Sequence, residues 1–249
     1  MTIGPAGAAS VGPHGLFLPK DPAAVLPVRN ADTSSLNWSG YATIAAAGHP
    51  ITDVTQHWTV VGAKVAPAGF SSTWAGVGGY NSTDLIQAGT ESDCASTPFA
   101  WYEILPASET PITSGCTGLV PSCAVAVGDK MFVDIKSNGG SSWTITMQDA
   151  GKWNWALTLN YPSTFSSAEW ILEAPTVGAQ TTIAHVGTQL FTPGNTFTSD
   201  GVAKNIKQGN PVRILLSPGL VNEATPSALN AAGTAFNDCT YKQTCAAPA

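Results

Sequence analysis

The chain has 249 residues, of which 43% are hydrophobic and only 10% are charged, and its formal net charge is −6. This length suits one large all-β domain or two small domains. Ten Lys and Arg residues are too few to build a basic patch, so nucleic acid is not expected as a partner. No stretch is long and apolar enough to span a membrane, so a membrane is not expected either. The low charge density limits self-repulsion in acid, which is compatible with exposure to low pH.

Residues 1–34 are rich in Gly, Pro and Ala and show no hydrophobic periodicity. We expect them to form a peripheral N-terminal extension: an extended arm, a linker or the remnant of a pro-segment. The first residues have neither the charged n-region nor the apolar h-region of a signal peptide, so a secretion signal would have to lie outside this sequence. Ordered structure is expected to begin near Leu36, and residues 35–249 are expected to form one domain.

Strand patterns separated by turn residues follow along the chain. Residues 127–135 precede a turn at 137–140, and residues 143–148 and 153–159 flank a second turn at 149–152. Alternation places one set of large apolar side chains on a single face of each of the latter two strands: Trp143, Ile145 and Met147, then Trp153, Trp155, Leu157 and Leu159. There is no convincing long amphipathic helix and no internal repeat. The pattern predicts an all-β antiparallel sandwich or barrel.

The chain has five cysteines, and an odd number leaves at least one outside intrachain disulfides. Cys116 and Cys123 flank a short loop, and Cys239 and Cys245 lie close together near the C-terminus. Two local disulfides are therefore expected, with Cys94 left over. Metal binding is the alternative, but it would favour CxxC or Cys/His clusters, and the sequence has none.

The common hydrolytic motifs are missing. None of the four histidines, His14, His49, His57 and His185, lies in HExxH, and there is no GxSxG. A Ser-His-Asp triad assembled from distant residues stays open. His57 and His185 lie within apolar runs and are interpreted as structural.

Three other segments hold candidate site residues. Residues 74–89 are expected to form a hairpin in which Leu85 and Gln87 share a face. Glycines at several of its strand positions indicate that something approaches the backbone there. Gln87 lies between apolar neighbours, so it is either a site residue or a polar side chain satisfied in the core or in solvent.

In residues 99–106, Trp101 and Glu103 share one face of a predicted strand, and Tyr102 lies on the other. Glu103 is either a solvated edge residue or an acid whose pKa is raised by desolvation beside the aromatic rings.

In residues 166–175, a strand would place Glu169, Ile171 and Glu173 on one face. A helix would start with a capping box at Ser166 and stop at Pro175, but Trp and Ile favour the strand. The two Glu side chains could both be solvated, or they could line a cleft and shift each other's pKa.

Together these segments resemble the glutamic peptidases, or eqolisins. Residues 37–40 (NWSG) are similar to the family's N-W-x-G opening. Residues 74–76 (WAG) followed by 85–89 (LIQAG) are similar to W-x-G … L-x-Q-x-G, residues 101–103 to W-Y-E, and residues 168–173 (AEWILE) to A-E-[FW]-I-x-E. The order and spacing agree across roughly residues 36–197. Two positions depart from the family pattern. Gly78 stands where fungal members have Asp, and Ala174 stands directly after Glu173, where family members commonly have an acid.

The resemblance implies a β-sandwich of two curved antiparallel sheets (concanavalin A-like or jelly-roll) and an acid endopeptidase that needs no metal or cofactor. It implies that Glu173 is the general base and Gln87 the oxyanion stabiliser, side by side on the concave face. It also implies a set of substrate-binding residues: Trp38, Trp74, Trp101, Tyr102, Glu103 and Glu169. The expected protein is a secreted monomer that acts on polypeptides.

Two functions from other classes stay open at this stage. A glycosidase would use two carboxylates among Glu103, Glu169 and Glu173, with Trp38 and Trp101 stacking on sugars. A carbohydrate-binding module on the same sandwich would need the aromatic rings but not the Gln–Glu pair.

Overall fold

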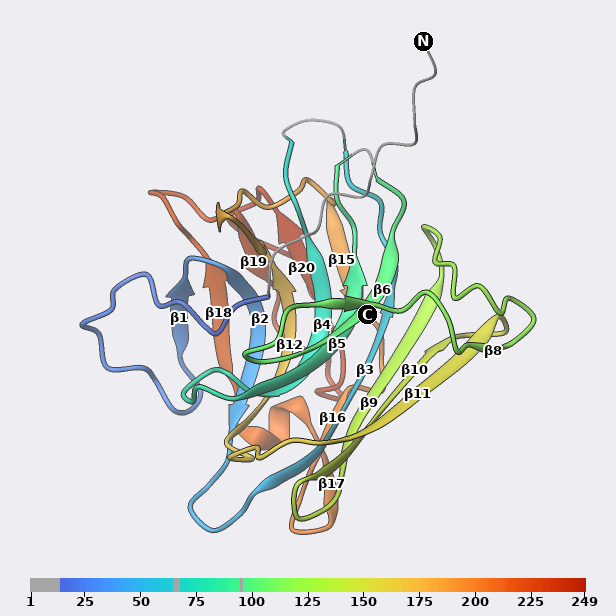
Figure 1. Cartoon of the computed structure of the whole chain (residues 1–249). Coiled ribbons are helices and arrows are strands. Elements are labelled where there is room, and N and C mark those ends of the chain that lie inside the picture. Colours follow the sequence, from blue (N-terminus) through green and yellow to red (C-terminus); the bar gives the residue numbers. More distant parts are fainter. Residues whose placement is uncertain (1–13, 65–67, 95) are drawn as a thin grey trace.

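Two antiparallel sheets pack face to face in the computed structural model, which describes residues 14–64, 68–94 and 96–249 (Figure 1). In that part of the chain the only helical element is the short 3₁₀ helix η1 (Ile206–Gly209). None of its helices could cross a membrane, since none has the necessary length and apolar character. The predicted all-β sandwich is therefore confirmed.

The first sheet carries the candidate site. Its strands pair in the order β1–β18–β2–β12–β4–β5–β6–β7, antiparallel except for β1 with β18. Its strands are β1 (Asp32–Ser35), β2 (Trp38–Ile44), β4 (Ser72–Gly78), β5 (Leu85–Glu91), β6 (Phe99–Ile104), β7 (Thr110–Pro111), β12 (Ser167–Glu173) and β18 (Val212–Leu216).

The second sheet closes the sandwich from the other side. Its order is β19–β20–β15–β3–β9–β10–β11–β8, and β3 also pairs with β16, which pairs with β17. Its strands are β3 (Ile51–Thr59), β8 (Thr117–Gly118), β9 (Lys130–Gly139), β10 (Ser142–Asp149), β11 (Trp153–Asn160), β15 (Thr188–Phe191), β16 (Thr196–Ser199), β17 (Val202–Asn205), β19 (Ala224–Pro226) and β20 (Phe236–Thr240). One pair, Leu216 with Ala224, joins the two sheets, and β13 (Thr176–Val177) and β14 (Ala179–Gln180) form a separate small ladder.

The core between the sheets follows from strand alternation. Trp143, Ile145 and Met147 on β10 are all fully buried, as the period of two predicted. They face the inward side chains of the first sheet, such as Trp170 on β12. Burying one side chain of this size contributes roughly 1.5–3 kcal/mol, so a few such residues per strand hold the sheets together. Both expected hairpins are present, between β9 and β10 and between β10 and β11.

Two disulfides each close a short loop of the chain. They join Cys116 to Cys123 and Cys239 to Cys245, which are the pairings expected from the spacing.

The described residues before Leu36 pack against the first sheet more closely than their composition suggested. The strand β1 extends the first sheet, and the Leu36 N–H donates to the Leu18 carbonyl at 2.8 Å. The ring of Phe17 is buried between Trp38 and Tyr80, with ring-centroid distances of 5.7 and 4.8 Å. Residues 1–13 of the expected extension lie outside the described residues. Two buried rings, Phe17 and His14, and hydrogen bonds to the main chain anchor this segment, and neither leaves a periodic signal in the sequence.

Candidate active site

The strand register gathers the candidate residues on one face of the first sheet. Residues two apart on a strand point to the same side, so aligned positions on neighbouring strands form rows. Three rows point to this face: Glu173, Ser72 and Glu91; Ile171, Trp74, Gly89 and Trp101; Glu169, Gly76, Gln87 and Glu103. Gln87 and Glu173 therefore share a face, although they lie in different rows.

The Glu173 carboxylate is held from two sides and is fully buried. The Trp74 indole Nε1–H donates to Oε2 at 2.7 Å, and the Asn37 side-chain amide donates to Oε1 at 3.3 Å. Hydrogen bonds to a carboxylate are roughly twice as strong as neutral ones, so this pair fixes the orientation of the group.

The Gln87 amide is oriented by Glu103. Its Nε2 donates to Glu103 Oε2 at 2.8 Å, and both side chains are fully buried. Burial is the main cause that raises the pKa of Glu103 to about 8, with the nearby Glu173 adding to the rise and His14 opposing it. Glu103 is therefore protonated at acid pH and adds no negative charge beside Gln87 there.

The N-terminal segment lies across these two residues. The His14 carbonyl accepts a hydrogen bond from Gln87 Nε2 at 3.3 Å, and the Gly15 N–H donates to Glu173 Oε1 at 3.1 Å. The Gly15 carbonyl accepts from the Trp38 indole at 3.1 Å. The peptide group between His14 and Gly15 thus has its carbonyl on Gln87 and its N–H on Glu173.

Residues 16–18 continue in the same manner. The Leu16 carbonyl accepts from Asn37 Nδ2 at 3.0 Å, the Phe17 N–H donates to the Gly79 carbonyl at 3.1 Å, and the Leu18 N–H donates to Asn37 Oδ1 at 3.0 Å. The segment is therefore held through its main chain, as a bound peptide would be.

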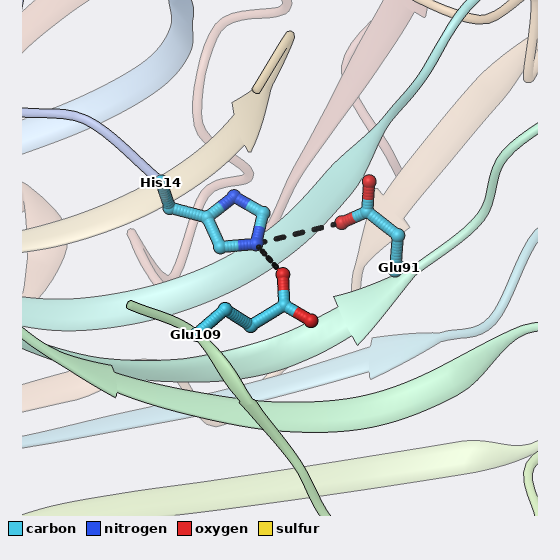
Figure 2. A group of neighbouring side chains, drawn as sticks. All are labelled: His14, Glu91 and Glu109. Atoms are coloured by element: carbon cyan, nitrogen blue, oxygen red, sulfur yellow. Dashed lines mark hydrogen bonds and ion pairs between the residues drawn. The ribbon is translucent and has the colours of Figure 1, made fainter. Parts of the chain in front are cut away.

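The His14 side chain enters a pocket of acids, two of which are shown in Figure 2. Its Nε2 lies 2.9 Å from Glu109 Oε2 and 3.6 Å from Glu91 Oε2, and its Nδ1 lies 3.4 Å from Glu173 Oε2. The ring stacks on Trp101 with centroids 3.8 Å apart and 18° between the planes.

Burial alone would lower the pKa of His14, but the hydrogen bond to Glu109 and the nearby carboxylates of Glu173 and Glu91 outweigh it and raise that pKa well above its ordinary value. His14, Glu91 and Glu109 also bring one potential ligand atom each within 4.8 Å of one another, a donor set that could hold a metal ion. Sequence reasoning missed all three residues, because His14 lies in a Gly/Pro-rich segment and its partners are distant along the chain.

The remaining predicted residues divide between the two faces of the sheet. Trp38, Trp74 and Trp101 are buried together in one apolar cluster on the site face. Tyr102 points to the opposite face, where its ring stacks on Trp155 at 5.3 Å, so it is not brought to the site.

Glu169 is on the site face and fully buried, four residues from Glu173 along β12, or about 13 Å at the usual strand rise. Burial raises its pKa well above the ordinary value, and the charge of Asp84 adds to this. The two Glu side chains are therefore neither solvated nor within contact distance of each other.

The departure at Gly78 has a local structural reason. Its φ is +89°, and a Cβ atom there would collide with the Asp84 carbonyl oxygen. A side chain at this position is strained in the present backbone conformation.

Comparisons with known proteins agree with this architecture. The model of the Peptidase A4 family matches residues 36–230, whereas the comparison with curated proteins gave no match. Similar solved structures include scytalido-glutamic peptidase with a transition state analog inhibitor (19% identity, TM-score 0.66) and SCP-B, a member of the eqolisin family, with the tripeptide Ala-Ile-His (17% identity, TM-score 0.65). Each match covers 82% of this chain and 98% of the other.

Together, the fold and the family match define a β-sandwich hydrolase of the peptidase class. The chain belongs to the Peptidase A4 family, the glutamic endopeptidases or eqolisins.

Proposed function

We propose that this peptidase hydrolyses polypeptides by direct attack of water, with Glu173 as general base and Gln87 as oxyanion stabiliser. The observation that carries the proposal is the His14–Gly15 peptide group, whose carbonyl accepts from Gln87 Nε2 and whose N–H donates to Glu173 Oε1. A substrate peptide bound in the same way would present its carbonyl to the donor and its leaving nitrogen to the acid.

The proton transfers follow from this arrangement. Ionised Glu173 takes a proton from a water molecule, whose oxygen attacks the carbonyl carbon. The negative charge that develops on the carbonyl oxygen is stabilised by the Gln87 N–H. Protonated Glu173 then returns the proton to the amide nitrogen as the carbon–nitrogen bond breaks. Oxygen Oε1 of Gln87 makes no hydrogen bond within the described part of the chain and can accept one from the attacking water.

Two neighbours position the reacting groups in this scheme. Trp74 holds Glu173 through Oε2, which leaves Oε1 directed at the peptide nitrogen. Glu103 holds one amide hydrogen of Gln87, which leaves the other for the oxyanion. Because a glutamine amide does not titrate in this range, the donor persists at low pH.

We further propose that the enzyme is acid-active, secreted and monomeric. Burial raises the pKa of both Glu103 and Asp238 to about 8, and it raises that of Glu91 and Glu169 well above the ordinary value. These acids are neutral at low pH, so the native state loses no stability there through their ionisation. The two disulfides support export, because such bonds persist in oxidising compartments.

Substrate choice tests the proposal. Denatured protein and a soluble polysaccharide are incubated separately with the purified chain at about pH 3–4. New amino termini are expected from the protein and no new reducing ends from the polysaccharide, and Gln87→Ala should slow proteolysis by about 10²–10³-fold. Release of reducing sugar without proteolysis would overturn the proposal in favour of a glycosidase.

A further inference from the structure

The His14 side chain is enclosed by the fold rather than resting on its surface. The imidazole has no exposed area, and neither does the Glu91 side chain, while that of Glu109 is 3% exposed. The three acids that contact the ring come from separate parts of the fold: Glu91 from β5, Glu109 from the segment before β7, and Glu173 from the end of β12.

The contacts suit a cationic ring. Both ring nitrogens face carboxylates: Nε2 hydrogen-bonds to Glu109, and Nδ1 lies 3.4 Å from Glu173 Oε2, a charge contact that favours the imidazolium form. The stacked Trp101 indole offers its electron-rich face to the same cation. Two further acids, Glu103 and Asp93, are near enough that the charge of His14 lowers their pKa values. Every titratable group that we find around the ring within the described residues is thus acidic.

The position of this pocket relative to the reacting groups gives it a role. His14 is the residue whose carbonyl rests on Gln87, so its side chain occupies the place of the substrate residue just before the cleaved bond. We propose that Glu91, Glu109 and Trp101 form a specificity subsite that selects a cationic side chain, histidine above all, at that substrate position. This inference rests on the proposed roles of Gln87 and Glu173.

An apolar residue would fit less well for a simple reason. It could stack on Trp101, but it would leave the almost fully buried Glu109 carboxyl without the hydrogen bond that it makes to the ring at 2.9 Å, and a buried polar group without a partner is costly. Lysine would supply the charge but no flat ring for the stack. A hydrogen bond to a charged group contributes enough to favour histidine over phenylalanine by roughly 10- to 100-fold.

Competition between two peptides in one reaction measures this preference. The peptides are identical except for His or Phe directly before a Gly, and cleavage by the full chain is followed at about pH 4.5 by mass spectrometry. Both substrates compete for the same enzyme, so any occupancy of the cleft by residues 14–18 cancels from the ratio of their kcat/KM values. The wild-type ratio should favour His by about 10-fold or more.

Two substitutions identify the source of the preference. Glu109→Gln should bring the ratio to within about threefold of one, because it removes the closest carboxylate charge and keeps the shape. The matched substitution Glu223→Gln, on the loop before β19, should leave the ratio at the wild-type value. A wild-type ratio near or below one, or a ratio that survives both Glu109→Gln and Glu91→Gln, would overturn the inference. So would loss of the preference on addition of EDTA, since the acids would then act through a metal ion.

A second readout does not depend on turnover. The imidazole of His14 can be titrated by NMR in the intact protein, where its pKa should lie well above that of a free histidine and should fall in Glu109→Gln. A wild-type His14 that titrates at the ordinary value would overturn the inference whether or not peptides are cleaved. A raised value together with no peptide cleavage would count against the proposed function instead.

Discussion

Replacing Gln87 with glutamate distinguishes an oxyanion donor from a residue that merely fills space. The new carboxyl would lie beside Glu103, whose oxygen is 2.8 Å from the present amide nitrogen. Two carboxyl groups at that distance do not readily ionise together, so the pair would share one proton over a wide pH range. Because Glu103 already has a pKa of about 8, the pair would hold that proton at neutral pH and gain the second only in acid.

Only the doubly protonated pair gives residue 87 a dependable O–H to donate to the oxyanion. Loss of one such donor costs about 10²–10³-fold in rate, or roughly 2.7–4 kcal/mol. The activity of Gln87→Glu should therefore be far below wild type at pH 5 and recover partly as the pH falls, until Glu173 itself is protonated. The expected result is an optimum shifted to lower pH.

The assay is kcat/KM for a chromogenic peptide between about pH 2 and 7. Gln87→Met is the control, since it has a similar size but no donor and should lower the rate without shifting the optimum. An unshifted, near-wild-type profile for Gln87→Glu would show that Gln87 is not the oxyanion donor.

Three further predictions concern positioning and stability. Trp74→Phe removes the indole hydrogen bond to Glu173 and should lower kcat/KM by about 10- to 100-fold with little change in the urea midpoint; unchanged kinetics would refute a positioning role. Burial raises the pKa of Asp238 from 3.8 to about 8. The stability that the protonated carboxyl contributes is therefore fully present below pH 3.8 and is lost as the pH rises through 8. The urea midpoint should be higher at pH 4 than at pH 8, and Asp238→Asn should reduce that difference; a higher midpoint at pH 8 would contradict this. Gly40→Ala places a Cβ against a main-chain carbonyl of β12 and should destabilise the fold by more than about 2 kcal/mol, whereas Gly48→Ala, also at positive φ but with open space, should cost about 1 kcal/mol; equal losses would rule out the collision.

The strand period predicted much of the fold and part of the site. Alternation alone placed Glu169 and Glu173 on one face of β12, and Trp101 and Glu103 on one face of β6, as the register shows. It also placed Tyr102 on the opposite face of β6. The expectation that Tyr102 binds substrate came from the motif, and the structure places its partly buried ring on the opposite face, against the core and beside Trp155.

The N-terminal segment could not be predicted from local pattern. The contacts of His14 with Glu109 and of Gly15 with Glu173 join residues 95 and 158 positions apart. No hydrophobic period marks such contacts, because they depend on one ring and a few main-chain groups. Composition indicated a peripheral arm, whereas the structure buries His14 and Phe17. The same limit applies to Glu91 and Glu109, whose role emerges only when their common partner is in place.

The most direct test of the central claim is the activity of Glu173→Gln on denatured protein at acid pH. The substitution keeps the size of the side chain and an oxygen that can accept from the Trp74 indole, and it replaces the oxygen that accepts from Gly15 and Asn37 with an NH₂ group, so it removes the base at the cost of those two hydrogen bonds. We predict a loss of at least about 10²–10⁴-fold in a protein that still unfolds cooperatively in urea, while Glu223→Gln retains wild-type activity. A folded Glu173→Gln protein that still digests its substrate at the wild-type rate would contradict the account.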